Sequence, residues 1–98
     1  MSQAKNPSET LKKTLTISNA RGLHARASAK FVQCVEGFDA DVRVSREGQT
    51  VGGTSIMGLM MLAASQGCSI KVSAKGADAQ AAMDAIEALI NDKFGEGE

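Results

Sequence analysis

Residues 11–37, LKKTLTISNARGLHARASAKFVQCVEG, contain the change of hydrophobic period that decides the fold. Apolar and polar residues alternate over 11–18, which predicts a β-strand with one apolar face. The segment 19–22, NARG, interrupts that alternation. Over 25–37 the apolar residues recur every three or four positions, which predicts an amphipathic helix that ends at Gly37 in a left-handed cap. The fold therefore opens with a strand, a short break and a helix.

The same two periods recur through the rest of the chain. Further strands are predicted over 40–45, from Thr50 to Val51 after a turn at 46–49, and over 68–75; further helices are predicted over 56–64 and 79–94, with Ser55 and Asp78 as N-caps. The element order is βαββαβα. Because each predicted strand has one apolar face, the expected α+β fold is a single sheet with helices packed on one side.

The size and charge of the chain exclude several classes of protein. Its 98 residues and 10.2 kDa can form one hydrophobic core. Eleven basic residues balance eleven acidic ones, and the aromatic residues are three Phe, which argues against nucleic-acid binding. No apolar run reaches the roughly 18 residues that a membrane helix needs. Residues 1–10 lack the apolar segment of a secretory signal, so we expect a cytoplasmic protein that does not bind membranes.

Metal and cofactor chemistry is not expected from the residues available. One histidine and two widely separated cysteines, Cys34 and Cys68, are too few ligands for a zinc site. In a reducing compartment both cysteines are predicted to be small buried apolar side chains, and a disulfide between them is the less favoured alternative. Basic residues predominate in 1–26 and acidic residues in 76–98, which indicates either two solvated faces or a basic end that binds an acidic partner.

The only histidine, His24, lies in the segment 21–26, RGLHAR, where the predicted strand gives way to the helix. It is not on the apolar stripe of that helix, so a buried structural role is not indicated. Helix N-termini leave backbone N–H groups free and carry partial positive charge, and they therefore bind phosphate. An imidazole there can act as a nucleophile while a guanidinium holds the phosphoryl oxygens. Local chemistry alone leaves two alternatives: a phosphoryl or anion site, and a surface histidine without a function.

Three segments together resemble HPr, the histidine-containing phosphocarrier of the bacterial phosphoenolpyruvate phosphotransferase system. Residues 22–26, GLHAR, are similar to the family pattern G-[IL]-H-A-R, and residues 55–62, SIMGLMML, are similar to its S-I-M-G-[VL]-M-x-L. The third segment is the strand, turn and helix over 68–94. The resemblance covers residues 11–94, and we expect residues 1–10 and 95–98 to be tails outside the domain.

The resemblance implies both the fold and the function. The implied fold is an open-faced β-sandwich, a four-stranded antiparallel sheet covered by three helices. The implied function is that of a phosphocarrier rather than an enzyme: His24 takes a phosphoryl group on Nδ1 from phosphorylated enzyme I and gives it to an enzyme IIA, while Arg26 stabilises the group in transit. Ser55 matches the position that HPr kinase/phosphorylase phosphorylates in lineages that have this kinase. We expect a monomer without a cofactor or metal.

The segment 56–62 predicts a docking surface. Leu59 and Leu62 are expected in the core, but the segment holds more apolar side chains than one short helix can bury. A methionine-rich exposed surface is adaptable and suits a protein that binds several partners. The expected docking residues are Ala27, Ile56, Met57 and Met60.

Two functions follow from the resemblance. The first is the phosphocarrier; the second is a regulatory protein of the nitrogen-type or kinase-linked branch, acting mainly by docking and by phosphorylation of Ser55. Ala27 stands where the family usually has Pro, and this departure slightly favours the regulatory branch over a dedicated sugar carrier. A regulator freed from phosphotransfer would be expected to lose the histidine. Because His24 and Arg26 are both present, the phosphocarrier is favoured.

Overall fold

A computed structural model describes residues 9–97, and its elements follow the predicted order. The strands are β1 (Thr10–Thr16), β2 (Asp41–Arg46), β3 (Gln49–Gly52) and β4 (Ser69–Lys75). The helices are α1 (Ala25–Glu36), α2 (Ile56–Met61) and α3 (Ala79–Asn91), followed by a 3-10 turn, η1 (Lys93–Gly95). The βαββαβα order predicted from the hydrophobic periods is confirmed.

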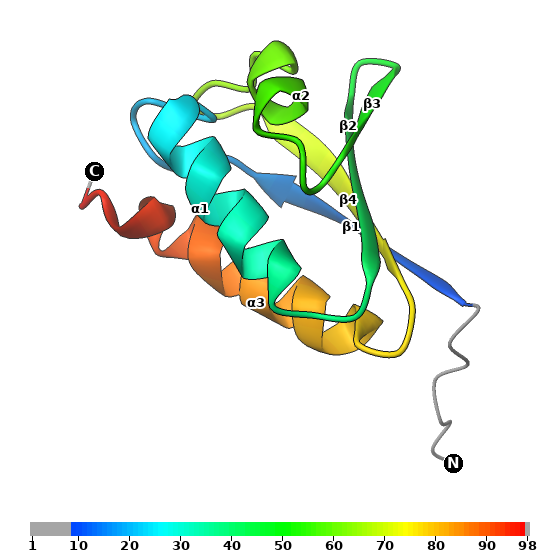
Figure 1. Ribbon diagram of the computed structural model, residues 1–98. Helices are drawn as coiled ribbons and strands as arrows, with labels where there is room; N and C mark the ends of the chain where they lie inside the picture. Colours follow the sequence, from blue (N-terminus) through cyan, green and yellow to red (C-terminus); the bar gives the residue numbers. More distant parts are fainter. Residues whose placement is uncertain (1–8, 98) are drawn as a thin grey trace.

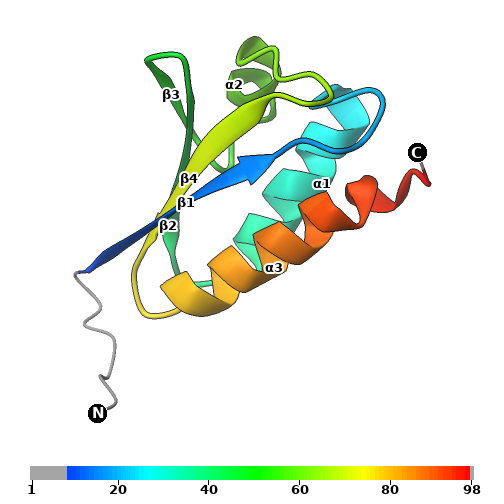
Figure 2. The same ribbon diagram turned by 180° about the vertical axis from the view of Figure 1, so that it is seen from behind.

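The four strands form one antiparallel sheet in the order β1-β4-β2-β3. In the register of the sheet, Val72 of β4 lies between Lys13 of β1 and Val44 of β2. One face of the sheet is apolar and carries the helices, with α3 against β1 and β4 and α2 against β3. Figures 1 and 2 show the three helices gathered on that side, while the other face stays open. The predicted open-faced sandwich is confirmed.

The core lies between the apolar face of the sheet and helices α1 and α3. Phe31, Ile86 and Ile90 project into it from the two helices and are almost fully buried. Burial of an apolar side chain of this size contributes roughly 1.5–3 kcal/mol. Lys13 lies on the same face of β1 as the apolar residues of that strand. Its amine extends to the edge of the core and lies 2.5 Å from Oε1 of Glu87 in α3. The core therefore ends at this ion pair.

The connection between β1 and α1 is held against the chain that follows α2. The N–H of Leu23 donates to the carbonyl of Ala64 at 2.9 Å, and the N–H of Gly67 donates to the carbonyl of Ile17 at 2.8 Å. Gly22 has φ +66°, and a Cβ built on it would lie 2.3 Å from the Ala64 oxygen. Only glycine fits this close approach. The contact fixes where the chain turns into α1.

Three ends of elements differ in detail from the sequence-based expectation. Gly37 caps α1 in a right-handed conformation, φ −78°, because its N–H still bonds to carbonyls of the last helical turn. Asp78 is the N-cap of α3, as predicted, but its side chain makes no capping hydrogen bond; its carboxylate instead accepts a hydrogen bond of 2.7 Å from the N–H of Asp39. The last helix ends at Asn91, and Phe94 follows with φ +54°, which returns its ring to the core.

Two further features concern burial and length. Cys34 and Cys68 are half-buried rather than fully buried, and both pack against the edge of the core. Desolvation raises the pKa of the Cys34 thiol. A hydrogen bond from Ser65 is the main cause of a lowered pKa at Cys68, and Arg46 adds to it. Within residues 9–97, no helix has the length and apolar character needed to cross a membrane.

Substitution of Gly22 tests the contact with Ala64. Gly22→Ala should lower the free energy of unfolding by about 3 kcal/mol or more, because the new methyl group meets a backbone oxygen in a left-handed conformation. Gly48→Ala is the matched control, since Gly48 also has a positive φ, +84°, but open space around its Cβ position. The control should lose only about 1 kcal/mol. Urea denaturation measures both, and equal losses would show that the close approach is unimportant.

Candidate functional site

His24 is the N-cap of α1, as the sequence predicted. Its backbone is extended, with φ −78° and ψ −176°, and its side chain makes no capping hydrogen bond. The first helical hydrogen bond runs from the N–H of Ser28 to the carbonyl of His24, at 2.9 Å. The three residues between them have N–H groups without an intrahelical partner. The imidazole is therefore not used to cap the helix, and it lies at the positive end of α1.

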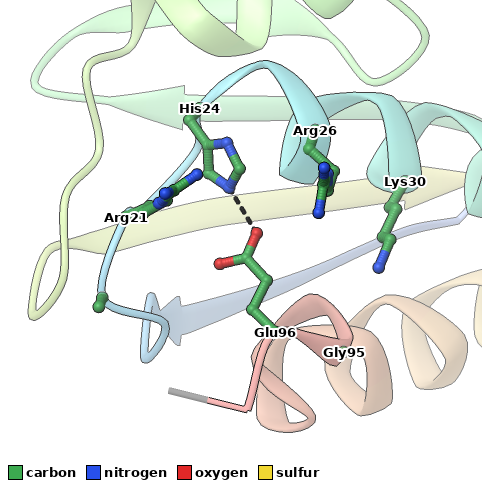
Figure 3. A pocket seen from close by; sticks show the side chains of 7 residues that line it. Arg21, His24, Arg26, Lys30, Gly95 and Glu96 are labelled. Atoms are coloured by element: carbon green, nitrogen blue, oxygen red, sulfur yellow. Dashed lines mark hydrogen bonds and ion pairs between the residues drawn. The ribbon is translucent and has the colours of Figure 1, made fainter.

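The ring of His24 opens into a hollow of about 300 Å³ between the start of α1 and the end of the chain. The cationic side chains of Arg21, Arg26 and Lys30 and the carboxylate of Glu96 surround it, as can be followed in Figure 3. The lining residues are Ala20, Arg21, His24, Arg26, Lys30, Gly95 and Glu96. Because the cations outnumber the carboxylate, the hollow is suited to an anion. A side-chain exposure of 24% leaves His24 accessible to a partner protein.

Arg26 is the second residue of α1. Its side chain is exposed and lies beside the imidazole of His24. Among the described residues it has no hydrogen-bond or ion-pair partner. Its fork of N–H groups is therefore available to an anion in the hollow. Lys30, one turn further along α1, is partly used: its amine donates to the carbonyl of Phe94 at 2.6 Å. Lys30 thereby ties α1 to the end of the chain.

Glu96 is a site residue that the sequence analysis missed. Its Oε2 accepts a hydrogen bond from Nε2 of His24, and its Oε1 accepts one of 2.9 Å from the side-chain amide of Asn19 (Figure 3). The Asn19 amide, then His24 and Arg21, lower the pKa of the Glu96 carboxyl below its usual range, although desolvation opposes them. The carboxylate is therefore ionised, and one of its two oxygens faces the imidazole of His24.

The end of the chain was expected to be a tail from residue 95 onward, and for residues 95 and 96 this is wrong. Phe94 is fully buried, and the N–H groups of Gly95 and Glu96 bond to carbonyls of the preceding turn. Two contacts join the basic N-terminal part and the acidic C-terminal part within the chain: Lys13 with Glu87, and His24 with Glu96.

Ser55 is the N-cap of α2, as predicted. Its Oγ accepts a hydrogen bond of 2.9 Å from the N–H of Gly58. Its backbone is extended, with φ −110° and ψ 104°. The side chain is exposed at the edge of α2, so it is accessible to a modifying enzyme. Both ribbon views place α2 beside the first turn of α1, and the two helices are in contact (Figures 1 and 2).

Helix α2 presents an apolar surface to solvent. Leu59 and Leu62 are buried, as expected. The exposed apolar residues, with exposed fractions of 39%, 72%, 40% and 64%, are Ile56, Met57, Met60 and Met61, which we call the α2 patch. Met61 adds to the three docking residues expected on this helix. Exposed apolar side chains grouped on one short helix, three of them thioethers, are the kind of surface feature that can take part in protein contacts.

Ala27 does not belong to that surface. Its exposed fraction is 0%, and its methyl group packs in the core with the buried face of α1. The expectation that it lines a docking surface is therefore corrected: its side chain cannot touch a partner. The position is the third of the helix, where the backbone N–H is free of helical hydrogen bonds, so Pro would remove no helical bond there.

Residues 9–97 bring together no group of three or more His, Cys, Asp or Glu side chains that could bind a metal ion. The arrangement instead offers one imidazole nucleophile, free amides at a helix end and an exposed guanidinium. These are the elements needed to hold a phosphoryl group covalently and to stabilise its negative charge.

Comparison with known proteins agrees with this arrangement. A family described as "PTS HPr component phosphorylation site" matches residues 11–92. The phosphocarrier protein HPr of Cupriavidus necator is 51% identical over 88 residues, which cover 90% of this chain and 99% of the relative. The phosphocarrier protein NPr of Shewanella violacea is 41% identical over 86 residues, covering 88% and 94%.

A crystal structure of HPr from Thermoanaerobacter tengcongensis has the same fold, with a TM-score of 0.84 and 43% sequence identity. The match covers 88% of this chain and 97% of the Thermoanaerobacter tengcongensis chain. The family match and the relatives extend over most of the chain, across both the His24 segment and the α2 segment. The chain belongs to the HPr family of phosphocarriers of the phosphotransferase system.

Proposed function

We propose that the protein accepts a phosphoryl group on Nδ1 of His24 from phosphorylated enzyme I and passes it to an enzyme IIA. The observation that carries this proposal is the imidazole of His24 at the N-terminus of α1, facing a cationic hollow. Its Nε2 is occupied by Glu96, so Nδ1 is the ring nitrogen left for attack. The protein is a carrier of this group rather than a catalyst, and we expect it to act as a cytoplasmic monomer.

The transfer needs no further reagent. The lone pair of Nδ1 forms a bond to phosphorus while the bond from phosphorus to the donor nitrogen breaks, and the electron pair of that bond returns to the donor. The reverse exchange delivers the group to the acceptor. During both exchanges, the free N–H groups of α1 and the guanidinium of Arg26 stabilise the charge on the phosphoryl oxygens.

The α2 patch supports docking of both partners. Donor and acceptor must each approach His24, and the patch lies beside the first turn of the helix that carries it. Methionine side chains are flexible and polarisable, so one surface can fit several partners. We propose that Ile56, Met57, Met60 and Met61 make the apolar part of the contact with enzyme I and with enzymes IIA.

Phosphorylation of Ser55 by HPr kinase/phosphorylase would regulate that docking. A phosphate on Ser55 would add roughly two negative charges beside an apolar contact surface. Because Ser55 is exposed, it can be modified without unfolding the chain. The proposal is therefore that the modification blocks docking rather than the chemistry at His24.

The alternative function is that of the regulatory branch. A relative named phosphocarrier protein NPr is among the similar proteins. The presence of His24, Arg26 and an open hollow favours phosphotransfer in either branch. The identity of the acceptor separates the two: a sugar-specific enzyme IIA accepts the group in one case and a nitrogen-type enzyme IIA in the other. Incubation of the phosphorylated protein with a panel of both types distinguishes them.

Phosphorylation of His24 is the first test. Incubation with enzyme I and phosphoenolpyruvate should add one phosphoryl group by intact mass, in an adduct that is labile to acid and stable to alkali. His24→Ala should take up none, because the chain has no other histidine. A circular dichroism spectrum controls for its fold. Full phosphorylation of His24→Ala would refute the assignment.

Arg26 should affect transfer more than stability. Lysine keeps the charge of arginine but lacks the fork of donors that matches phosphoryl oxygens. Arg26→Lys should therefore slow phosphorylation by enzyme I about tenfold, a change of about 1.4 kcal/mol in the barrier, while the melting temperature stays nearly unchanged. Arg43→Lys, on the open face of the sheet, is the control and should transfer normally. Equal rates for Lys and Arg at position 26 would show that the fork is not used.

Ser55→Asp should imitate part of the effect of phosphorylation. Aspartate is also a good N-cap, so the free energy of unfolding should change by less than about 1 kcal/mol. Its charge beside the α2 patch should raise the KM of enzyme I for this protein. Ser69→Asp places the same charge on an exposed position of β4, on the face opposite the helices, and should leave KM unchanged. A folded Ser55→Asp variant with an unchanged KM would refute the docking role of the patch.

A further inference from the structure

We propose that Glu96 is a positioning residue that holds the proton of His24 on Nε2 and so keeps the lone pair of Nδ1 free for attack on phosphorus. This inference rests on the proposed function. The observation behind it is the direct contact between Oε2 of Glu96 and Nε2 of His24, which joins residues 72 positions apart in the chain. Figure 3 shows the carboxylate approaching the imidazole from the C-terminal segment.

The identity of the protonated nitrogen follows from the acceptor. An ionised carboxylate has lone pairs but no hydrogen to donate, so the hydrogen of this bond belongs to Nε2. Glu96 is ionised, because the Asn19 amide stabilises its charged form and lowers its pKa. A neutral imidazole carries one ring proton, and Glu96 retains that proton at Nε2. Nδ1 is therefore the unprotonated nitrogen of the nucleophilic form.

The carboxylate is held in place by more than the imidazole. The Asn19 side chain is fully buried, and its amide nitrogen donates to the carbonyl of Gly22 and to Oε1 of Glu96, both at 2.9 Å. Its Oδ1, also buried, has no hydrogen-bond partner among the described residues. A buried acceptor without a donor costs stability. Asn19 nevertheless directs both hydrogens of its side-chain amide to one end of the site. A locally unfavourable arrangement of this kind is typical of a functional constraint.

The segment that carries Glu96 is anchored as well. Phe94 is fully buried, and its carbonyl accepts the amine of Lys30 at 2.6 Å. The N–H of Glu96 bonds to the carbonyl of Lys93 at 2.9 Å. Glu96 is thus fixed by its backbone, by Asn19 and by the imidazole. A carboxylate held in this way can select one tautomer, which a freely rotating side chain could not do.

The same contact stabilises the ring during transfer. When Nδ1 forms its bond to phosphorus, the ring keeps its Nε2 proton and positive charge develops on the imidazole. The carboxylate at Nε2 stabilises that charge, in the way the buried aspartate of a serine protease triad stabilises its histidine. The two nitrogens point to different sides of the ring, so Glu96 does not occupy the position of the phosphoryl group. The charged groups facing the ring are Arg21, Arg26, Lys30 and Glu96.

Two substitutions separate this role from a merely structural one. In Glu96→Gln, the amide oxygen would accept from Asn19, and the amide NH₂ would then face Nε2 of His24 and donate to it. The ring proton would move to Nδ1, the tautomer that cannot attack. In Glu96→Ala, the ring would lose its partner and exist as a mixture of tautomers. If Glu96 has only a structural role, the isosteric Glu96→Gln should impair phosphotransfer less than Glu96→Ala. If Glu96 controls the tautomer, Glu96→Gln should impair phosphotransfer more than Glu96→Ala.

The experiment combines nitrogen NMR and kinetics on the full chain. Ring ¹⁵N chemical shifts of the unphosphorylated protein, measured at the alkaline end of a pH series, should show the Nε2–H form in the parent, the Nδ1–H form in Glu96→Gln and a mixture in Glu96→Ala. Phosphorylation by enzyme I should slow about a hundredfold in kcat for glutamine and about tenfold for alanine, with KM within about threefold. Glu36→Gln, an exposed site at the end of α1, is the charge-matched control and should behave as the parent.

The outcomes are distinguishable. Glutamine transferring as fast as alanine or faster, or an unchanged tautomer in Glu96→Gln, would overturn the role of Glu96. Failure of enzyme I to phosphorylate the parent protein would instead overturn the proposed function. The NMR measurement needs no phosphotransfer, so it still tests the contact in that case: the expected tautomers support tautomer control, and identical tautomers in all variants refute it.

Discussion

The close approach of two backbone segments at Gly22 determines where α1 and its N-cap, His24, begin. The carbonyl of Ala64 fills the space that any Cβ at position 22 would need, and it accepts the N–H of Leu23. This contact stops the strand β1, turns the chain and begins α1 at a fixed place beside α2. The backbone contact therefore holds the start of α1, with His24 as its N-cap, against the segment that follows α2.

The site itself combines two parts of the chain that the sequence separates widely. The first turn of α1 contributes the imidazole and the guanidinium, and the segment after α3 contributes a carboxylate. Each part has its own anchor: Asn19 is buried below the loop, and Phe94 is buried below the C-terminal turn. The hollow is thus supported on both sides by core residues. A site that is arranged in advance in this way reduces the entropy that would be lost on binding.

The sequence predicted the elements and the position of His24 at the start of α1, because both depend on local patterns. Alternation and helical periodicity located every strand and helix, and the break before α1 placed His24 at the N-cap. Glu96 could not be predicted in this way. Its position depends on the left-handed conformation of Lys93 and Phe94, which no local preference favours and which the burial of the Phe94 ring imposes. The burial of Ala27 likewise depends on the depth at which α1 packs, not on helical spacing.

The exposure of the α2 methionines has a consequence for oxidative stress. Met57 and Met61 have exposed fractions of 72% and 64%, so oxidants in solution can reach their thioethers. Conversion to the sulfoxide makes an apolar side chain polar, and methionine sulfoxide reductases reverse the change. Because neither residue supports the core, the oxidised protein would keep its fold and its imidazole. It would lose apolar contact area instead, and a reductase could restore the carrier without new synthesis.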